Sequence, residues 1–518
     1  MTVRPRFRHT KKALLTVAAA TALALGGLLA GGAGTPSRAA TAEPCDIYAA
    51  AGTPCVAAHS TTRALYAAYD GALYQVERAS DDTTTDVYPL SAGGYANSAT
   101  QDSFCADTYC EITEIFDQSG HGNNLTDAPA GGADSGPDIL ANAAAAPTEA
   151  GGHKVYGVNI SLGMGYRDDS TTDIATGNAS EGEYAVLDGT HFDNECCFDY
   201  GNAETNNDND GDGAMEAINF GDETTWGYGS GSGPWIMADM ENGLFSGEGA
   251  GLNSADPTTD YRFTTAMLEG GANQWALLGG NADSGSLSTD YSGVRPSGYN
   301  PMKKQGAIIL GIGGDNSDNS AGTFYEGVLT SGYPTAATEA AVQANIVSVG
   351  YANYALPSNP FTTGAEVSLQ ATTPCCTADY LTGDYPSSDE VGADAVTSSS
   401  SSTVKEDATW IVEPGLANSS CVSFKSANGS GDYIRHYNFE LYLEPSDGTT
   451  QFALDATFCP RAGNSGSNYS FMSYNYSYKY IRHYNYIGYV ASDGGSNAWD
   501  ASSLWYEDST WAVASPWS

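Results

Sequence analysis

The hexapeptide Tyr433-Ile-Arg-His-Tyr-Asn438 returns unchanged as Tyr480-Ile-Arg-His-Tyr-Asn485, and this repeat decides the fold of the C-terminal part of the chain. Tyr380-Leu-Thr-Gly-Asp-Tyr385 occupies the same place in a third, weaker copy. The copies lie roughly 50 residues apart, which is too short for an independent domain and typical of one supersecondary unit that shares its core with its neighbours. Each copy closes on Asp-(Ala/Ser)-Thr-aromatic, at Asp407–Trp410, Asp455–Phe458 and Asp508–Trp511.

These units have the composition of short β-strands, because they are rich in Tyr, Phe, Ser and Thr and are interrupted by Gly, Asn, Asp and Pro turns. Three such units predict a β-trefoil. Two copies carry a histidine, His436 or His483, where the first copy has Gly383. Since all three units need the same core packing, this difference indicates two ligand pockets and one that has been lost. The alternative is that the closing aspartates only cap turns.

The N-terminal residues 1–42 have the pattern of a signal peptide. Five cations precede an apolar run from Ala13 to Ala30, and the small residues Ala39–Ala42 offer a cleavage site. A membrane anchor is the alternative, but the run is diluted by Ala and Gly, and no second apolar stretch of spanning length follows. We therefore expect a secreted, extracellular protein. The five cations are Arg4, Arg6, Arg8, Lys11 and Lys12.

The charge of the mature chain excludes some classes of partner. Cleavage after residue 42 would remove six of the 20 Lys and Arg and no acidic residue, which leaves 14 basic and 62 acidic side chains; 14 minus 62 gives a net charge of −48. Such a field repels nucleic acid and anionic membranes, and it leaves a neutral partner such as a polysaccharide.

All ten cysteines follow the predicted cleavage site, as expected for disulfides in an oxidising compartment. Spacing suggests Cys45 with Cys55, Cys105 with Cys110 and Cys421 with Cys459. Two further pairs, Cys196-Cys197 and Cys375-Cys376, are adjacent in the sequence, with Cα atoms about 3.8 Å apart. Oxidised, each would form a rigid apolar plate. Zinc is the alternative, but paired CxxC motifs are lacking and histidines are few.

Neither a metal nor another cofactor is expected. Asp208-Asn-Asp-Gly-Asp-Gly213 looks like the start of a calcium loop, but Asn219 stands at the twelfth position, where such a loop needs a bidentate glutamate. This stretch is interpreted as an acidic surface turn.

We expect a separate large domain over 43–355, ahead of the trefoil at 356–518, with a seam at Leu356–Phe361. This part is low in charge and rich in Gly, Tyr, Ser and Thr, and it predicts an all-β, jelly-roll-like β-sandwich. Helical periodicity is clearest over Thr335–Ala352. The strand-like runs include Lys154–Ile160, Tyr184–Leu187 and Gln305–Ile312.

Two carboxylates in the large domain are candidate catalytic groups. Read as one strand, Pro234–Phe245 places Asp239 and Glu241 on one face beside Trp235, where like charges would shift each other's pKa. The alternative is a solvated strand face.

Asp315 follows an apolar run, Ala307–Ile312, and two glycines that allow a substrate to approach the backbone. Partial desolvation there would raise the pKa of Asp315 toward what a general acid needs. A plain loop is the alternative reading. Together with Glu241, Asp315 supplies the two carboxyl groups that glycoside cleavage requires.

The chain resembles the family 54 glycoside hydrolases, which are secreted α-L-arabinofuranosidases with a β-sandwich catalytic domain and a family 42 carbohydrate-binding module of β-trefoil form. The resemblance covers nearly the whole mature chain. Besides the two Arg-His-Tyr-Asn copies, it rests on the motifs Pro44–Tyr48, Cys55–Leu65, Phe116–Gly120, Glu195–Glu204, Trp226–Asp239 and Gly327–Tyr333.

The resemblance implies roles for particular residues. Glu241 falls on the family's nucleophile and Asp315 on its acid/base, in a retaining reaction with carboxyl groups about 5 to 5.5 Å apart. The Cys196-Cys197 disulfide would lie beneath the sugar. In the module, His436 would pair with Asp455 and His483 with Asp508, whereas no family role is available for Cys375-Cys376. Further sugar contacts would fall on Trp226, Asp239, Asn242 and Gly314.

The sequence therefore predicts a monomeric, exo-acting enzyme that removes arabinofuranosyl side chains from arabinoxylan or arabinan. A β-xylosidase or a dual-activity enzyme is one alternative, because both sugars present similar rings to a small pocket. A lectin-like binding protein without turnover is another, and the presence of both Glu241 and Asp315 argues against it.

Overall fold

The structure is a computed structural model that describes residues 42–106, 108–355 and 360–518. Apart from position 42, the predicted signal peptide lies outside the described residues, as does most of the predicted seam at Leu356–Phe361. Over the described ranges, none of the helices is both long enough and apolar enough to cross a membrane.

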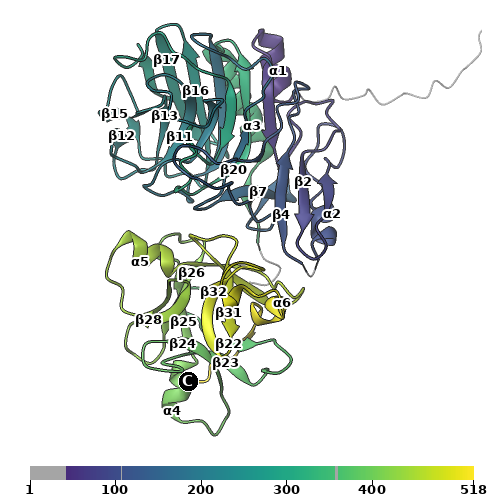
Figure 1. The fold of residues 1–518 in the computed structure, drawn as a ribbon, viewed down its shortest axis with the longest axis vertical. Coiled ribbons are helices and arrows are strands. Elements are labelled where there is room, and N and C mark those ends of the chain that lie inside the picture. Colours follow the sequence, from purple (N-terminus) through teal and green to yellow (C-terminus); the bar gives the residue numbers. More distant parts are fainter. Residues whose placement is uncertain (1–41, 107, 356–359) are drawn as a thin grey trace, which may run out of the picture. The chain divides into compact units, whose positions relative to one another are not determined.

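The large domain is a β-sandwich of two sheets, in which the spatial order of the strands differs from their order in the sequence (Figure 1). In the described part of the chain, the first sheet has nine strands. In spatial order they are β18 (Ser288–Gly293), β17 (Gln274–Asn281), β16 (Phe263–Gly271), β9 (Glu181–Asp188), β20 (Gly322–Ser331), β7 (His153–Ile160), β6 (Ala146–Ala150) and β21 (Ala352–Asn353), with β1 (Cys55–Ser60) paired to β20.

The second sheet carries the residues of the candidate site. Its seven described strands are β14 (Leu244–Phe245), β13 (Trp235–Asp239), β11 (Glu216–Gly221), β10 (Asp199–Ala203), β19 (Ala307–Leu310), β8 (Tyr166–Asp168) and β5 (Thr126–Asp127). Two smaller sheets complete the domain: β3 (Thr83–Val87), β2 (Tyr74–Arg78) and β4 (Cys110–Ile115) form one, and β12 (Gly227–Ser230) with β15 (Gly251–Pro257) forms the other.

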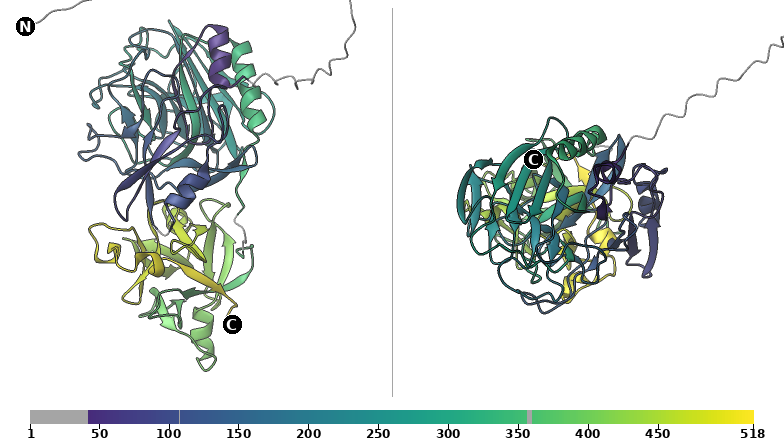
Figure 2. Two further views of the ribbon diagram at one scale, coloured as in Figure 1. Left: turned by 90° about the vertical axis from the view of Figure 1, so that its right-hand side faces the viewer. Right: turned by 90° about the horizontal axis from the view of Figure 1, so that it is seen from above.

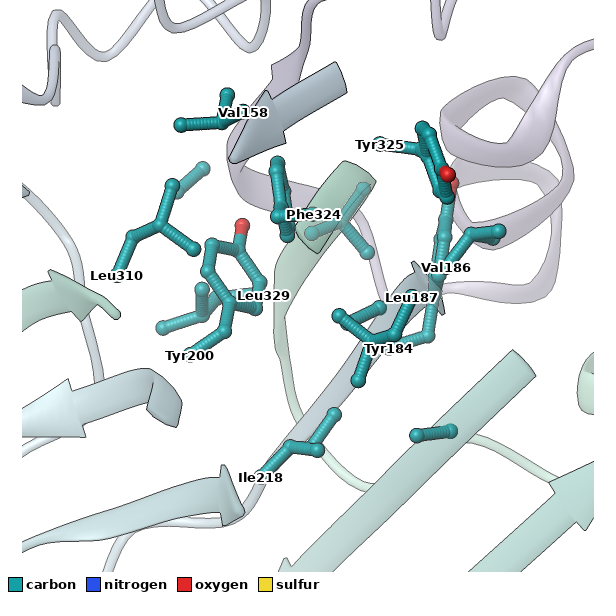
Figure 3. Close-up of a cluster of buried hydrophobic side chains, with 14 of the residues drawn as sticks. Val158, Tyr184, Val186, Leu187, Tyr200, Ile218, Leu310, Phe324, Tyr325 and Leu329 are labelled. Carbon is teal, nitrogen blue, oxygen red and sulfur yellow. The ribbon is translucent and has the colours of Figure 1, made fainter. Parts of the chain in front are cut away.

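The core lies between the sheets and under two helices. Figure 3 shows Tyr200 and Ile218, from the second sheet, gathered with Leu187 and Phe324 of the first. All eight residues of β9 are buried, as expected for a central strand covered on both faces. Each large apolar side chain buried in this way contributes about 1.5–3 kcal/mol.

Helices α1 (Pro44–Ala51) and α3 (Ala336–Val349) lie side by side against the first sheet (Figure 2). Tyr48 of α1 stacks on Tyr184 of β9 and donates a 2.6 Å hydrogen bond to Glu339 of α3. Helix α3 lies within the stretch predicted to be helical, but α1 and α2 (Ser98–Phe104) were not predicted, because both are short.

One cluster of buried charges between the sheets is paired. Lys304 contacts Glu181 of β9 at 2.5 Å and Glu216 of β11 at 2.8 Å, and Arg295 pairs with the other oxygen of Glu216. Such a cluster is tolerated in a dry interior only because each charge has a partner. This cluster links the two sheets, and composition alone gave no sign of it.

The predicted strand over Pro234–Phe245 is wrong in its second half. Strand β13 ends at Asp239, and the chain turns through Glu241 and Asn242, which have φ of 66° and 56°. The N–H of Met240 donates to the carbonyl of Gly243, which closes a two-residue hairpin turn. Hairpin turns of this kind need positive φ at both central positions, which Asn tolerates well and Glu rarely adopts. The turn therefore overrides the period-two pattern.

The C-terminal part is the predicted trefoil, with twelve described strands in three similar sets. Trp410 and Trp511 begin equivalent strands, and their indole N–H groups donate to the equivalent carbonyls of Leu381 and Ile481 at 3.0 and 3.1 Å. The sets are β22 (Glu366–Ala371), β23 (Asp379–Gly383), β24 (Val391–Ala395) and β25 (Trp410–Pro414); β26 (Val422–Ser426), β27 (Tyr433–Tyr437), β28 (Glu440–Glu444) and β29 (Phe458–Ala462); and β30 (Tyr469–Ser473), β31 (Tyr480–Tyr484), β32 (Ile487–Ala491) and β33 (Trp511–Ala514).

A short helix precedes the last strand of each repeat, which the expectation of strands alone did not include. The closing aspartate is the last residue of each helix, so the repeat motif marks a helix end. Thr449 caps the second helix by accepting the N–H of Phe452 at 3.1 Å. The helices are α4 (Ser402–Asp407), α5 (Thr450–Asp455) and α6 (Trp505–Asp508), with a 3-10 turn, η1 (Ala498–Asp500), before the third.

All ten cysteines lie in the described ranges, and all are paired. The bonds join Cys45 to Cys55, Cys105 to Cys110, Cys196 to Cys197, Cys375 to Cys376 and Cys421 to Cys459.

Candidate active site

A small pocket of about 120 Å³ opens at the second sheet, where the turn after β13 meets the loop after β19. All eight residues that the sequence singled out in the large domain line it. They are Cys196, Cys197, Trp226, Asp239, Glu241, Asn242, Gly314 and Asp315, and the remaining lining residues are Asn209, Gly243, Leu244, Gly313 and Ser317.

Glu241 is held by its own turn. Its N–H donates to Asp239 Oδ1 at 2.9 Å, and its carbonyl accepts the hydroxyl of Tyr299 at 2.8 Å. A glutamate at positive φ is uncommon and occurs where surrounding contacts enforce it, most often at functional sites. These contacts fix the backbone from which the carboxyl group extends.

The loop that carries Asp315 depends on its glycines. A Cβ at Gly314 would collide with Glu204 Oε2, and the carbonyl of Gly314 accepts Arg167 Nη1 at 2.8 Å. The hydroxyl of Ser317 donates to Asp315 Oδ1, which leaves the other oxygen free of this bond. Asp315 itself is half-buried at the pocket wall.

The disulfide between Cys196 and Cys197 forms another wall. Cys197 Sγ lies 3.6 Å from Asp239 Oδ2, so the apolar sulfur and a hydrogen-bonding oxygen are neighbours. A Cβ at Gly313 would lie 3.3 Å from the same sulfur, and a glycine there lets the Asp315 loop pass close to the disulfide. A flat apolar surface beside an acceptor suits a sugar ring, with its C–H face and its hydroxyl edge.

Two buried carboxyl groups near the pocket, those of Asp199 and Glu204, were not singled out from the sequence. Burial first, and then the neighbouring carboxyl groups of Glu204, Asp239 and Asp315, raise the pKa of Glu241 to about 10. Burial, opposed by the N–H of Glu241, raises the pKa of Asp239 to about 7. Burial and then Asp239 raise the pKa of Asp199.

Burial and mutual repulsion thus raise the pKa values of three neighbouring carboxyl groups at this site, those of Asp199, Asp239 and Glu241. Asp199 is the first residue of β10, which is buried throughout, and Glu204 follows its last residue. An acidic residue in a buried strand was the signal by which they could have been found.

The Asp208–Gly213 stretch supports the rim of the pocket. Asn209 Nδ2 donates to Asn242 Oδ1 at 2.7 Å, and Asn242 Nδ2 donates to Asp212 Oδ1 at 3.1 Å. The loop is an exposed acidic turn, and its contacts orient Asn242.

Two of the three trefoil repeats contain a buried histidine near the closing aspartate. His436 Nε2 lies 3.5 Å from Asp455 Oδ1 in a pocket of about 470 Å³, and His483 Nε2 lies 3.7 Å from Asp508 Oδ1. Burial lowers the pKa of both histidines, so both are neutral near pH 7.

In the first repeat, a Cβ at Gly383 would lie 2.9 Å from Leu443 and 3.3 Å from Trp410. These apolar side chains crowd the place that the histidine occupies in the other two repeats.

Comparisons with known proteins agree with this arrangement. Residues 44–352 match the family model "Alpha-L-arabinofuranosidase B, catalytic", and residues 369–513 match the "Alpha-L-arabinofuranosidase B (ABFB) domain". A probable α-L-arabinofuranosidase B from Aspergillus clavatus is 56% identical over 94% of this chain and 97% of its own. An arabinofuranosidase/β-xylosidase from Trichoderma koningii is 55% identical over 91% and 95%.

Solved structures give the same result. An arabinofuranosidase complexed with arabinofuranosyl-α-1,2-xylobiose superposes with a TM-score of 0.86 and 55% identity, over 92% of this chain and 99% of that one. A family 54 variant soaked with 4-nitrophenyl α-L-arabinofuranoside has the same TM-score and identity, over 92% and 100%. Because the two family models together span most of the chain and these relatives align along nearly all of it, the protein belongs to the α-L-arabinofuranosidase B family.

Proposed function

We propose that the protein is a retaining, exo-acting α-L-arabinofuranosidase with Glu241 as nucleophile and Asp315 as acid/base. The observation that carries the proposal is that both carboxyl groups line one small pocket walled by a disulfide. A pocket of about 120 Å³ suits a single terminal sugar. Chain-end cleavage follows from that size.

In the first step, Glu241 attacks the anomeric carbon while Asp315 protonates the leaving oxygen. The bond from carbon to the leaving oxygen breaks as the bond to Glu241 forms, and an arabinosyl-enzyme ester results. In the second step, Asp315 takes a proton from water, which attacks the same carbon and releases Glu241. Two inversions give net retention of configuration.

Glu241 must be ionised to attack, although burial and its neighbours raise its pKa. Glu204 is fully buried beside it and has a raised pKa of its own, first because of burial. We place the proton on Glu204 when a sugar fills the pocket, with Glu204 then donating toward Glu241. Glu204 is in this account a positioning residue, because it acts through Glu241 and does not line the pocket.

The substrate is proposed to be the arabinofuranosyl side chain of arabinoxylan or arabinan, met outside the cell. Support comes from the solved relative in complex with arabinofuranosyl-α-1,2-xylobiose and from the predicted signal peptide. The strongly acidic mature chain disfavours polyanions as partners. We expect the enzyme to act as a monomer.

The trefoil is proposed to hold arabinofuranosyl groups in two pockets, one at His436 and Asp455 and one at His483 and Asp508. In each pocket, the carboxylate offers acceptors for sugar hydroxyls beside the ring of a neutral imidazole. Residues 1–42 are proposed to be removed, with the catalytic domain at 43–355 and the binding module at 356–518.

A second candidate is β-xylosidase or dual activity, because one relative is named arabinofuranosidase/β-xylosidase. Hydrolysis of nitrophenyl α-L-arabinofuranoside and nitrophenyl β-D-xyloside by the purified protein separates the possibilities. We expect the arabinofuranoside to be hydrolysed much faster. Comparable rates would favour dual activity, and hydrolysis of neither would make the protein a binding protein.

A further inference from the structure

We infer that the first trefoil repeat, which lacks a histidine of its own, builds one wall of the third repeat's pocket with Thr373 and the Cys375-Cys376 disulfide. The inference rests on the proposed function, because it takes an arabinofuranosyl ring as the ligand of that pocket. It gives the second adjacent cysteine pair a binding role.

The loop after the first strand of each repeat contacts the closing aspartate of the preceding repeat. Asn475 Nδ2 donates to Asp455 Oδ1 at 2.9 Å, and Asn428 Nδ2 donates to Asp407 Oδ1 at 3.3 Å. Thr373 is the equivalent residue in the first repeat, because Gln370 and Met472 pair with the equivalent tyrosines. Each pocket is thus made by two repeats.

Thr373 closes the polar part of the third pocket. Its hydroxyl donates to Asp508 Oδ1 at 2.7 Å and lies 2.9 Å from His483 Nε2. Since one hydroxyl hydrogen goes to the carboxylate, the hydroxyl oxygen accepts the Nε2–H of His483. Arg482 donates to the other oxygen of Asp508 at 3.0 Å, so Thr373 and Arg482 together fix the carboxylate.

After Thr373 and its equivalent Asn475, the two loops present different side chains to a sugar. In the second pocket the next residue is Tyr476, whose ring lines the cavity 5.5 Å from the ring of His436 and 5.1 Å from that of Phe439. In the first repeat the next residue is Pro374, and the two cysteines follow it. The third pocket therefore has a disulfide near the place where the second has an aromatic side chain.

The disulfide is held close to the pocket and faces solvent. The N–H of Cys376 donates to the carbonyl of Thr373 at 2.8 Å, so both cysteines belong to one turn that starts at the pocket residue. Cys375 is exposed and Cys376 is half-buried, outside the packed cores. A bond between adjacent residues constrains the unfolded chain little, so chain stabilisation does not account for it.

The active-site pocket combines the same two features, a disulfide between adjacent cysteines and an aspartate. There, Cys197 Sγ lies 3.6 Å from Asp239 Oδ2, with the sulfur as an apolar wall and the carboxylate as an acceptor. A C–H face of a pentofuranose fits an apolar plate, while its hydroxyls reach the aspartate. By this chemistry, Cys375 and Cys376 contact the ring and Asp508 binds its hydroxyls.

The test is calorimetry of the full chain carrying Glu241→Gln, titrated with methyl α-L-arabinofuranoside. An Asp455→Ala background isolates the third pocket, and an Asp508→Ala background isolates the second. The variant lacking both aspartates gives the contribution of the active site, which is subtracted. The protein with Cys375→Ser and Cys376→Ser is then compared in each background.

We expect the cysteine changes to weaken the third pocket about tenfold, because the apolar contact is lost, and to leave the second pocket unchanged. Thr373→Val, which keeps the disulfide, should weaken the third pocket only, and Asn475→Ala the second only. The second pocket and the melting temperature serve as controls for folding.

Unchanged affinity of the third pocket after the cysteine changes, or equal losses in both backgrounds, would overturn the inference while leaving the proposed function intact. A different result, in which Asp508→Ala removes no binding site, would instead contradict the proposed role of the pocket itself.

Discussion

The backbone N–H of Glu241 donates a 2.9 Å hydrogen bond to Asp239 Oδ1, so the last residue of β13 fixes the turn that carries the proposed nucleophile. The bond explains how a glutamate is kept at a φ of 66°. It also connects the nucleophile to the disulfide, because the other oxygen of Asp239 contacts Cys197.

Asp239→Ala should release this turn and lower kcat/KM about 10²-fold or more, since small displacements of a reacting group have effects of that size. Asp239→Asn retains an oxygen that can accept the Glu241 N–H, and it should lose less. Steady-state kinetics on nitrophenyl α-L-arabinofuranoside measure both. Equal losses would mean that the charge of Asp239, and not the turn, is what matters.

Glu204→Gln should move the acidic limb of the kcat/KM profile to lower pH. Burial and then Glu204 raise the pKa of Glu241, and replacing the carboxyl group by an amide removes the second influence. Glu241 then stays ionised to lower pH, and that limb reports the ionisation of the free enzyme. A limb that stays in place or moves to higher pH would remove Glu204 from the proton balance.

Asp315→Asn should slow substrates with poor leaving groups roughly 10²- to 10⁴-fold, and activated aryl glycosides much less in the first step. Azide should partly restore turnover of the activated substrates, because it attacks the arabinosyl-enzyme without a general base. The comparison needs two aryl arabinofuranosides of different leaving-group pKa. If both fell equally, the acid/base would have to be another residue.

Lys304→Met should destabilise the protein by about 3–5 kcal/mol, because it leaves two buried carboxylates short of a partner. Burial acts to raise the pKa of Glu216, but Lys304 and Arg295 lower it to about 2, so its stabilisation is present above its unfolded pKa and is lost as pH falls toward 2.

Without Lys304, the pKa of Glu216 should rise from its low value, and the pKa of Glu181, which burial already raises to about 7, should rise further. The variant should then gain stability as pH falls, because its folded state binds more protons. Denaturant unfolding across pH measures this. Lys303→Met is a matched control, since Lys303 is exposed, and it should change stability by less than about 0.5 kcal/mol. A pH-independent loss would show that packing, not charge, is responsible.

Local patterns were enough to predict much of this protein. The Tyr-Ile-Arg-His-Tyr-Asn copies predicted the trefoil, and Glu241 and Asp315 were singled out from their chemistry. The resemblance to the family added residues from two further segments, and residues from all four segments line one pocket. The turn after Asp239 was missed because period-two alternation was followed through a Glu-Asn-Gly turn. The element was wrong, although Asp239 and Glu241 do line the pocket.

The positioning groups could not be predicted in the same way. Glu204 and Arg167 act on the pocket residues Glu241 and Gly314, which lie far from them in the sequence. No local spacing encodes such contacts. The three trefoil helices were missed because they have at most six residues, and two of them begin at a single capping side chain, Ser401 or Thr449. Short elements carry too little periodicity to stand out from turns.

The central claim is that Glu241 becomes covalently bonded to the sugar, and trapping that species tests it most directly. The Asp315→Asn variant, mixed with an activated aryl α-L-arabinofuranoside, should accumulate the ester because water attack lacks its base. After acid quenching and digestion, mass spectrometry should find one added pentosyl group on the peptide that contains Glu241. A pentosyl group on a different residue, or an inverted product with no adduct, would contradict the account.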